Sequence, residues 1–333
     1  MASEALNDTG IAIVDFAPFL DGSSKKEVAD SILSSFKEVG FVYLLNHGIP
    51  QERIAEMFEL SKTFFSQPMD VKQLAPHPPS GTHHRGYSSP GQEKVVQHVY
   101  HPDAIAEERA RAPDAKESFE CGREGDEVMP NIWLPDGVLP GFKEKSLDFF
   151  WLCYEIELNI LRALALGFDL PEEYFLKYHT APDNQLRLLH YPSVPTEALQ
   201  NERISRIGQH SDFGSITLLL QDDVGGLEVE DPHIAGLFRP APPIQGALAV
   251  NAGDFMMRWS NDTIRSTIHR VRAPPHAKSD GMTPDRYSIP YFCCADFRTV
   301  VDCIPGTWSD ERPKKYEPIS AEEYIMKRMA ATY

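Results

Sequence analysis

Positive charge is scarce in this sequence. Among its 333 residues, 32 are Lys or Arg and 49 are Asp or Glu, which gives a net charge of −17. A broad basic surface of the kind that binds nucleic acid is therefore not expected. An anionic ligand would have to be held by a local cluster of positive charge rather than by the field of the whole protein.

Long hydrophobic runs are missing as well. No stretch of 18 apolar residues occurs, so we expect no membrane span and no membrane partner. The first 16 residues, MASEALNDTGIAIVDF, lack the basic region and long apolar segment of a signal peptide. We therefore expect a cytoplasmic protein.

The cysteines are few, and their arrangement does not suit a disulfide framework. Their number is odd, two are adjacent and no CxxC pair exists, which argues against disulfide scaffolds and zinc ribbons. We expect them to be buried or incidental thiols in a reducing compartment. The five are Cys121, Cys153, Cys293, Cys294 and Cys303.

What remains is the composition of an ordinary globular protein, with 42% apolar and 24% charged residues. The 27 prolines indicate many turns and loops. The length would allow two domains, but barrels decorated with helices reach this size as one unit. We expect an N-terminal region over 1–140 and a core over 141–333, together forming one compact body.

The first region predicts two helices and two strands. Ile11 to Val14 has the pattern of a strand, and an amphipathic helix follows from Lys25 to Val39. The apolar run 41–45 is expected to be a buried strand, and a second helix should begin after Pro50 and end near Phe65. Residues 76–140 are rich in Pro, Gly, His and charge, which predicts a long loop region.

The second region begins with the longest helical pattern, from Phe142 to Leu166, with a short helix expected from Pro171 to Tyr178. A last helix is predicted from Ala321 to Met329. Between them, short apolar segments alternate with turn residues, which is typical of a barrel or a jelly roll. The predicted strands are 185–191, 204–209, 215–220, 226–230, 247–250, 254–259, 267–272 and 286–293.

The segment Gly208-Gln209-His210-Ser211-Asp212 carries the first chemical signal. At the end of a strand, His210 and Asp212 would share a face, and His269 is the best candidate for a third ligand. Two imidazoles and one carboxylate form the facial triad of non-haem Fe(II) oxygenases. An HxD pair alone is weak, because the chain has twelve histidines.

The second signal is Arg286-Tyr287-Ser288, which lies 17 residues after His269. On a strand, Arg286 and Ser288 face the same side, where a guanidinium fork and a hydroxyl can bind a carboxylate. A surface salt bridge would be the common explanation for such an arginine. Its apolar neighbours Ile289 and Phe292 favour a protected position instead.

These motifs together resemble the plant- and fungal-type Fe(II)/2-oxoglutarate-dependent dioxygenases, the group that includes isopenicillin N synthase. Residues 209–222, QHSDFGSITLLLQD, look like the first core block of that family, and 225–229, GGLEV, look like its next strand. Residues 250–254 and 259–261 precede His269 as they do there. Residues 40–48, GFVYLLNHG, resemble its N-terminal region. The similarity covers nearly the whole chain.

The resemblance implies an α+β protein with a mainly β core, a double-stranded β-helix (jelly roll) beside a long helix. It implies that His210, Asp212 and His269 bind iron and that Arg286, Ser288 and Tyr191 bind 2-oxoglutarate. Many plant members have Asn two residues before that tyrosine, where this chain has Leu189.

The implied cofactors are Fe(II), 2-oxoglutarate and O2, with ascorbate as a reductant. The implied reaction is oxidation, chiefly hydroxylation, of a C–H bond in a small molecule of secondary metabolism, with succinate and CO2 as co-products. A monomer or a weak homodimer is expected. For substrate contacts we predict the cationic and aromatic residues near the mouth of the barrel and Cys294: Arg85, Tyr87, Arg187, Phe213, Phe292 and Cys294.

Three alternatives stay open at this point. An oxidase like isopenicillin N synthase would keep the iron and the Arg-x-Ser pair but would not use 2-oxoglutarate. A jelly-roll protein without catalysis is also compatible, because a fold does not fix a function. A zinc hydrolase fits less well, because two histidines and one aspartate beside a carboxylate-binding pair suit iron better. The substrate itself is not indicated.

Overall fold

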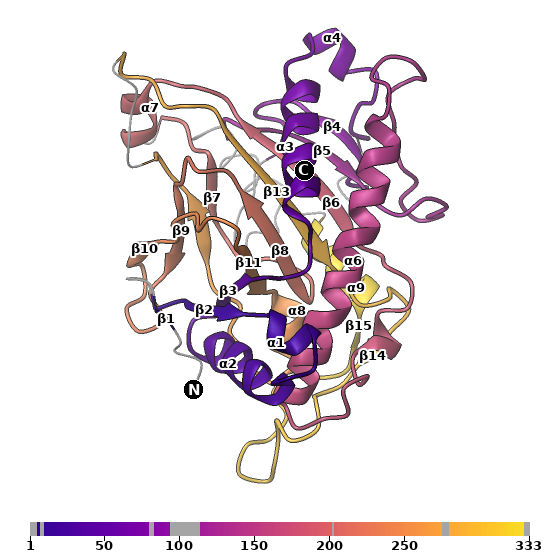
Figure 1. The fold of residues 1–333 in the computed structure, drawn as a ribbon, viewed down its shortest axis with the longest axis vertical. Coiled ribbons are helices and arrows are strands. Elements are labelled where there is room, and N and C mark those ends of the chain that lie inside the picture. Colours follow the sequence, from indigo (N-terminus) through magenta and orange to yellow (C-terminus); the bar gives the residue numbers. More distant parts are fainter. Residues whose placement is uncertain are drawn as a thin grey trace.

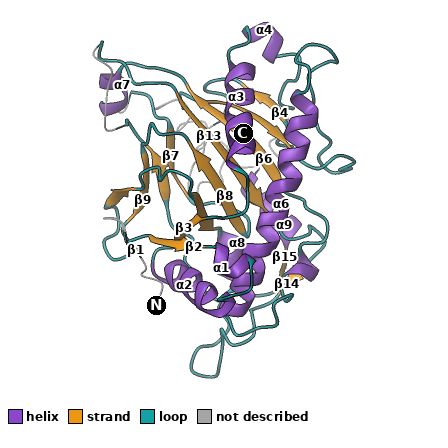
Figure 2. Ribbon diagram, in the orientation of Figure 1, coloured by secondary structure: helices purple, strands orange, loops and turns teal. Residues whose placement is uncertain are grey.

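A computed structural model describes residues 5–6, 10–79, 83–93, 114–201, 203–274 and 280–329. In it, two β-sheets carry the core and helices lie along one side of the larger sheet (Figures 1 and 2). No described helix has the length and apolar character that a membrane span requires. The helices are α1 (Ala17–Leu20), α2 (Lys25–Glu38), α3 (Gln51–Phe65), α4 (Met69–Lys72), α6 (Phe142–Gly167), η1 (Leu176–Tyr178), α7 (Thr196–Gln200), α8 (Asp254–Trp259) and α9 (Ala321–Met329).

The larger sheet has nine strands in the order β1-β2-β3-β11-β8-β13-β6-β5-β4. All neighbours run antiparallel except β2 and β3. Strands from both ends of the chain therefore share one sheet. Its strands are β1 (Ala5–Leu6), β2 (Ala12–Asp15), β3 (Phe41–Leu45), β4 (Gly86–Ser88), β5 (Glu117–Cys121), β6 (Gln185–Tyr191), β8 (Ile216–Gln221), β11 (Leu248–Ala252) and β13 (Arg286–Cys293).

The smaller sheet has four antiparallel strands in the order β10-β9-β12-β7. Together the two sheets form the jelly-roll core that was expected. A separate pair, β14 (Val300–Val301) and β15 (Ile319–Ser320), precedes α9. The strands of the smaller sheet are β7 (Ile207–His210), β9 (Leu227–Glu230), β10 (Phe238–Pro240) and β12 (His269–Val271).

Alternation along the strands separates the helical side of the large sheet from its inner side. On β6, Leu186 and Leu188 belong to the main hydrophobic core with α3 and α6, while Arg187 and Leu189 face a cavity. On β13, Ile289 and Tyr291 enter the same core. The helices thus bury one face of the sheet, and the opposite face is free to carry polar chemistry.

Several predicted elements are confirmed closely. The strands at 41–45, 185–191 and 286–293 and the helix over 321–329 have the predicted bounds. The predicted long helix ends one residue later, at Gly167. The cysteines are free thiols, as expected.

Three predictions need correction. Residues 254–259 form helix α8 instead of a strand, because Phe255, Met256 and Trp259 are buried together on one helical face. The helix expected over 171–178 is reduced to the three residues of η1. The segment 76–140 is not only loop, since it contributes β4 and β5 to the large sheet.

Candidate metal centre and cavity

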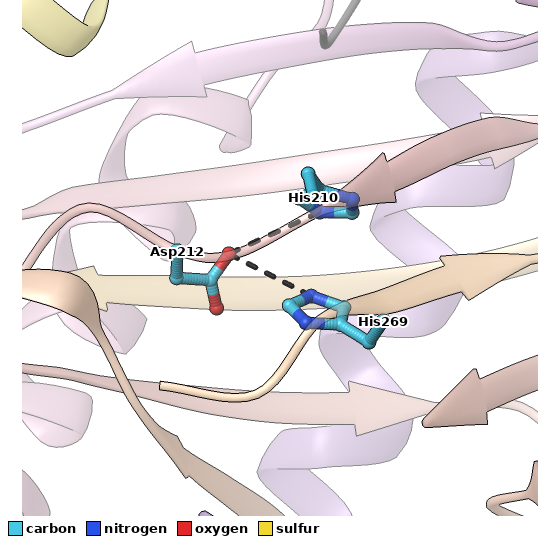
Figure 3. Close-up of side chains that lie close together, drawn as sticks. All are labelled: His210, Asp212 and His269. Carbon is cyan, nitrogen blue, oxygen red and sulfur yellow. Dashed lines mark ion pairs between the residues drawn. The ribbon is translucent and has the colours of Figure 1, made fainter. Parts of the chain in front are cut away.

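Strands β7 and β12 bring the two predicted histidines face to face. His269 is the cross-strand partner of His210, and their ring centroids lie 4.2 Å apart. Asp212 follows the end of β7, and its Oδ1 lies 4.0 Å from His210 Nε2 and 3.7 Å from His269 Nε2. All three side chains are buried, with ligand atoms within 4.8 Å of one another. Figure 3 shows the three side chains converging from two backbone segments, the end of β7 with the residues that follow it and the start of β12.

Hydrogen bonds from the Nδ1 atoms of His210 and His269 fix the orientation of the two imidazole rings. His210 Nδ1 donates to the carbonyl of Gly208 over 2.8 Å, and His269 Nδ1 donates to the carbonyl of Thr267 over 3.1 Å. Each Nε2 therefore keeps its lone pair directed at Asp212. Burial, together with the neighbouring His269, lowers the pKa of His210 to about 3, so the ring is in the neutral form that binds metals.

The carboxylate of Asp212 is oriented by two donors. Thr217 Oγ1 and Asn251 Nδ2 each donate to Oδ2 over 2.7 Å. Its other oxygen, Oδ1, is thereby left facing the imidazoles. The backbone amide of Asp254 donates to the carbonyl of Asp212 over 2.8 Å, which ties this segment to the start of α8.

The donor set fits Fe(II). Two neutral imidazoles and one oriented carboxylate on one side of a point leave the cavity side open for further ligands, as in the facial triad of iron oxygenases. A zinc site of four protein ligands is not formed, because this triad is the only group of three or more His, Cys, Asp or Glu within metal-binding distance among the described residues.

A second polar group surrounds Arg286 at the start of β13. Its side chain is buried, Nη1 donates to Ser288 Oγ over 3.3 Å, and Nη2 donates to Gln221 Oε1 over 3.2 Å. Tyr191, its cross-strand partner on β6, places its ring 5.0 Å from the guanidinium carbon. Among the described residues no carboxylate forms an ion pair with Arg286, so a buried positive charge is left for an anion.

One cavity of about 130 Å³ joins the triad to this arginine. It lies between the sheets, because residues from strands of both sheets line it. The large sheet contributes alternate residues of β6 and β13, and the small sheet contributes β7, β9 and β12. The lining from β6 and β13 is Gln185, Arg187, Leu189, Tyr191, Arg286, Ser288, Pro290 and Phe292.

Five of the six predicted substrate residues line this cavity: Arg85, Arg187, Phe213, Phe292 and Cys294. Tyr87 is not among the lining residues. Its hydroxyl donates to Glu117 Oε2 over 2.5 Å, and its ring packs edge-to-face on Phe64 at 5.9 Å. The side chain of Tyr87 is thus committed to the core beside β4 and β5.

Arg187 is held in a buried network of charges. Its Nη1 lies 3.0 Å from Glu93 Oε1, and its Nε lies 3.0 Å from Glu120 Oε1. Lys116 also pairs with Glu93. Burial alone would raise the pKa of Glu93, but Arg187 and Lys116 outweigh it and lower that pKa. The guanidinium of Arg187 lies 5.5 Å from the ring centroid of Phe292.

Sequence reasoning missed several residues of the site. Asn251 and Thr217 orient Asp212, although the sequence presents them only as parts of family-like blocks. Glu93 reaches the cavity from a loop whose sequence gives no structural signal. Helix α9 also lines the cavity, through Ile325 and Met329, and no sequence pattern linked it to the site.

Comparison with known proteins agrees with this geometry. Residues 182–295 match the model of the 2OG-Fe(II) oxygenase superfamily, and residues 11–136 match the N-terminal domain named for the non-haem dioxygenase in morphine synthesis. A proline hydroxylase of Petromyces alliaceus, buaE, is 38% identical over 96% of this chain and 98% of its own length. The 2-oxoglutarate-dependent dioxygenase gloF of Glarea lozoyensis is 35% identical over 97% and 99%.

A solved structure extends the likeness to the fold. A full-length protein of Neurospora crassa, crystallised in complex with 2-oxoglutarate and thymine, is 42% identical to this chain. It superposes with a TM-score of 0.89 over 99% of this chain and 100% of that chain.

The chain belongs to the 2OG-Fe(II) oxygenase superfamily. It is therefore an oxidoreductase that uses Fe(II), 2-oxoglutarate and O2 to oxidise a small molecule, with succinate and CO2 as co-products. The predicted family, fold class and reaction class are confirmed, as are the cofactors Fe(II), 2-oxoglutarate and O2. The 2-oxoglutarate bound in the related structures favours this chemistry over the three alternatives left open by the sequence.

Thr217→Val tests how Asp212 is oriented. The change removes one of the two hydrogen bonds to Oδ2 at nearly constant volume, so we expect Fe(II) or Mn(II) to bind about 10- to 100-fold more weakly. Metal titration followed by calorimetry measures this. Thr263→Val is the matched control, because its buried hydroxyl has no hydrogen-bond partner in the described part of the chain. Equal metal affinity in the two variants would contradict the orienting role.

Arg187→Met tests the buried network. It leaves Glu93 and Glu120 without their shared cation, so we expect the free energy of unfolding to fall by about 3 to 5 kcal/mol. Urea denaturation checks this. Arg162→Met is the control, because its exposed pair with Glu173 should contribute less than about 1 kcal/mol. Similar losses in both variants would count against a structural role for the network.

Proposed function

We propose that His210, Asp212 and His269 hold the iron of this oxygenase, and that Arg286, Ser288 and Tyr191 bind the distal carboxylate of 2-oxoglutarate. The observation that carries the proposal is a single cavity lined both by the triad and by a buried arginine that has no carboxylate partner among the described residues. A dianion with a chelating end and a free carboxylate end matches these two features.

Different residues along the cavity would bind the iron and the co-substrate. The imidazoles and Asp212 present neutral and anionic donors to Fe(II), and Thr217 and Asn251 keep the carboxylate turned toward it. Arg286 and Ser288 orient the co-substrate from the other side. When bound, Fe(II), 2-oxoglutarate and O2 supply the oxidising power that cleaves the substrate C–H bond.

At the end of the cavity near Phe292 and Phe213, where we place the substrate, the lining is aromatic and mostly apolar. Phe292 lies against Arg187, and Phe213 follows directly on Asp212. An apolar cluster packs against Phe213. Such a wall would keep water away from the reacting bond and leave the few polar groups to fix the orientation of the substrate. The cluster consists of Met129, Cys294, Phe297, Ile325 and Met329.

We propose a small polar ring compound as substrate. The Neurospora crassa structure holds thymine, and the relative buaE is named a proline hydroxylase; thymine and proline are both small rings that carry polar groups. In this chain a flat face of such a ring would lie against Phe292, and its polar atoms would reach Arg85 or Arg187, which line the same cavity.

The test is a screen for substrate-triggered succinate formation. Thymine, related pyrimidines, L-proline and other small rings are each added with Fe(II), 2-oxoglutarate, ascorbate and O2, and succinate and oxidised product are measured by mass spectrometry. We expect at least one ring compound to raise succinate formation about tenfold or more above the rate without substrate, with stoichiometric oxidised product.

His210→Ala should abolish this turnover, because it removes one of three iron ligands. His233→Ala is the matched control, since His233 is exposed and pairs only with Glu38 among the described residues. Unchanged turnover by His210→Ala would refute the metal assignment. Turnover confined to long-chain or polymeric compounds would refute the proposed substrate class.

A further inference from the structure

A second arginine near the co-substrate end is buried without a counter-ion. Arg206, directly before β7, has a fully buried side chain. Its Nη2 donates to the carbonyl of Pro284 over 2.8 Å, while Nε and Nη1 have no hydrogen-bond partner among the residues that the structure describes. Within the described part of the chain, no carboxylate lies at ion-pair distance from it. Burying a charge in this way is costly unless something compensates it.

Arg206 and Arg286 share one neighbour. The ring of Tyr191 lies 5.7 Å from the guanidinium carbon of Arg206 and 5.0 Å from that of Arg286. Burial, together with repulsion from Arg286, lowers the pKa of Arg206 to about 10, which still leaves it protonated at neutral pH. The buried, positively charged side chains of Arg206 and Arg286 are therefore both close to the ring of Tyr191.

The nearest acidic groups are engaged elsewhere. Asp222 Oδ2 accepts a hydrogen bond from the amide of Tyr287. Asp285 Oδ1 accepts from His190 Nε2 over 3.0 Å and from the amide of Ser193 over 3.3 Å. Both carboxylates attract Arg206 at longer range, but neither forms an ion pair with it. The excess positive charge at this end of the cavity is thus not neutralised by the described residues.

Arg206 does not itself line the cavity, whereas its neighbours Tyr191 and Ile207 do. We propose that Arg206 is a positioning residue for the co-substrate: it holds Tyr191 in place and adds a second positive charge that favours a distal carboxylate. The site would thereby select 2-oxo acids that carry two negative charges. This inference rests on the proposed binding of 2-oxoglutarate at Arg286.

The competing explanation is structural, in which Arg206 only anchors the segment at Pro284. The two roles differ in their dependence on the ligand. An electrostatic role affects a ligand with a distal carboxylate and spares one without it, while a loss of structure weakens both.

The experiment compares two 2-oxo acids of equal chain length by anaerobic calorimetry, with Mn(II) in place of iron. These are 2-oxoglutarate and 2-oxopentanoate, which lacks the distal carboxylate. Arg206→Gln keeps a donor for the Pro284 carbonyl but removes the charge, and Arg206→Lys keeps the charge. Arg203→Met serves as the control, because Arg203 is an exposed arginine three residues away.

We expect Arg206→Gln to weaken 2-oxoglutarate binding about tenfold and to change 2-oxopentanoate binding less than about twofold, because one charge–charge interaction is lost. Arg206→Lys and Arg203→Met should stay within about threefold of the unaltered protein. Equal losses for both acids, or no loss for either, would overturn the inference. If the unaltered protein binds 2-oxoglutarate no better than 2-oxopentanoate, the proposed Arg286 pocket fails as well.

Discussion

The antiparallel pairing of β7 with β12 is the contact on which the site depends. It places His269 opposite His210, and a register shift between His269 and Val271 breaks the regular ladder there. Asp212 completes the group because β7 ends just before it and the chain turns toward the large sheet. There Thr217 on β8 and Asn251 on β11 hold its carboxylate. The three proposed ligands thus come from two segments, β7 with the residues after it and β12, and the pairing of these strands brings them together.

The same segment connects the metal centre to the C-terminal helix. Asp254, whose amide holds the carbonyl of Asp212, also pairs with Arg328 of α9. The guanidinium of Arg328 lies 4.5 Å from the ring of Phe213. Since α9 contributes Ile325 and Met329 to the cavity, this part of the cavity wall is attached to the backbone that carries Asp212, a proposed iron ligand.

Charge balance distinguishes the two ends of the cavity. The chain carries a net charge of −17, yet several arginines line or adjoin this space. Near Phe292, Arg187 is compensated by Glu93 and Glu120. Around Tyr191, Arg286 and Arg206 are not compensated within the described residues. The uncompensated end suits a dianionic co-substrate, and the compensated end suits a neutral or zwitterionic molecule.

How far the sequence predicts this protein depends on which interaction determines each part. The strands at 185–191 and 286–293 were located closely because each is a short segment rich in apolar residues that follows turn residues such as Pro182 and Pro284. The six residues of α8 were misassigned, since a short apolar run does not separate helix from strand. Strand β5 was missed because its buried residues include Glu117 and Glu120, which hide the expected hydrophobic pattern.

The candidate site was also predicted only in part. The triad was predicted because two histidines and one aspartate suit Fe(II) and stand in family-like sequence blocks. Glu93 and Arg206 were not singled out, because each acquires its significance from partners far along the chain, Arg187 for the first and Pro284 for the second.

A crystal structure of the protein with Mn(II) and 2-oxoglutarate, analysed by anomalous scattering, tests the central claim most directly. We predict one metal peak bound by the Nε2 atoms of His210 and His269 and by the carboxylate of Asp212, with the distal carboxylate of 2-oxoglutarate on Arg286 and Ser288. A metal held by other residues, or a distal carboxylate away from Arg286, would contradict this assignment.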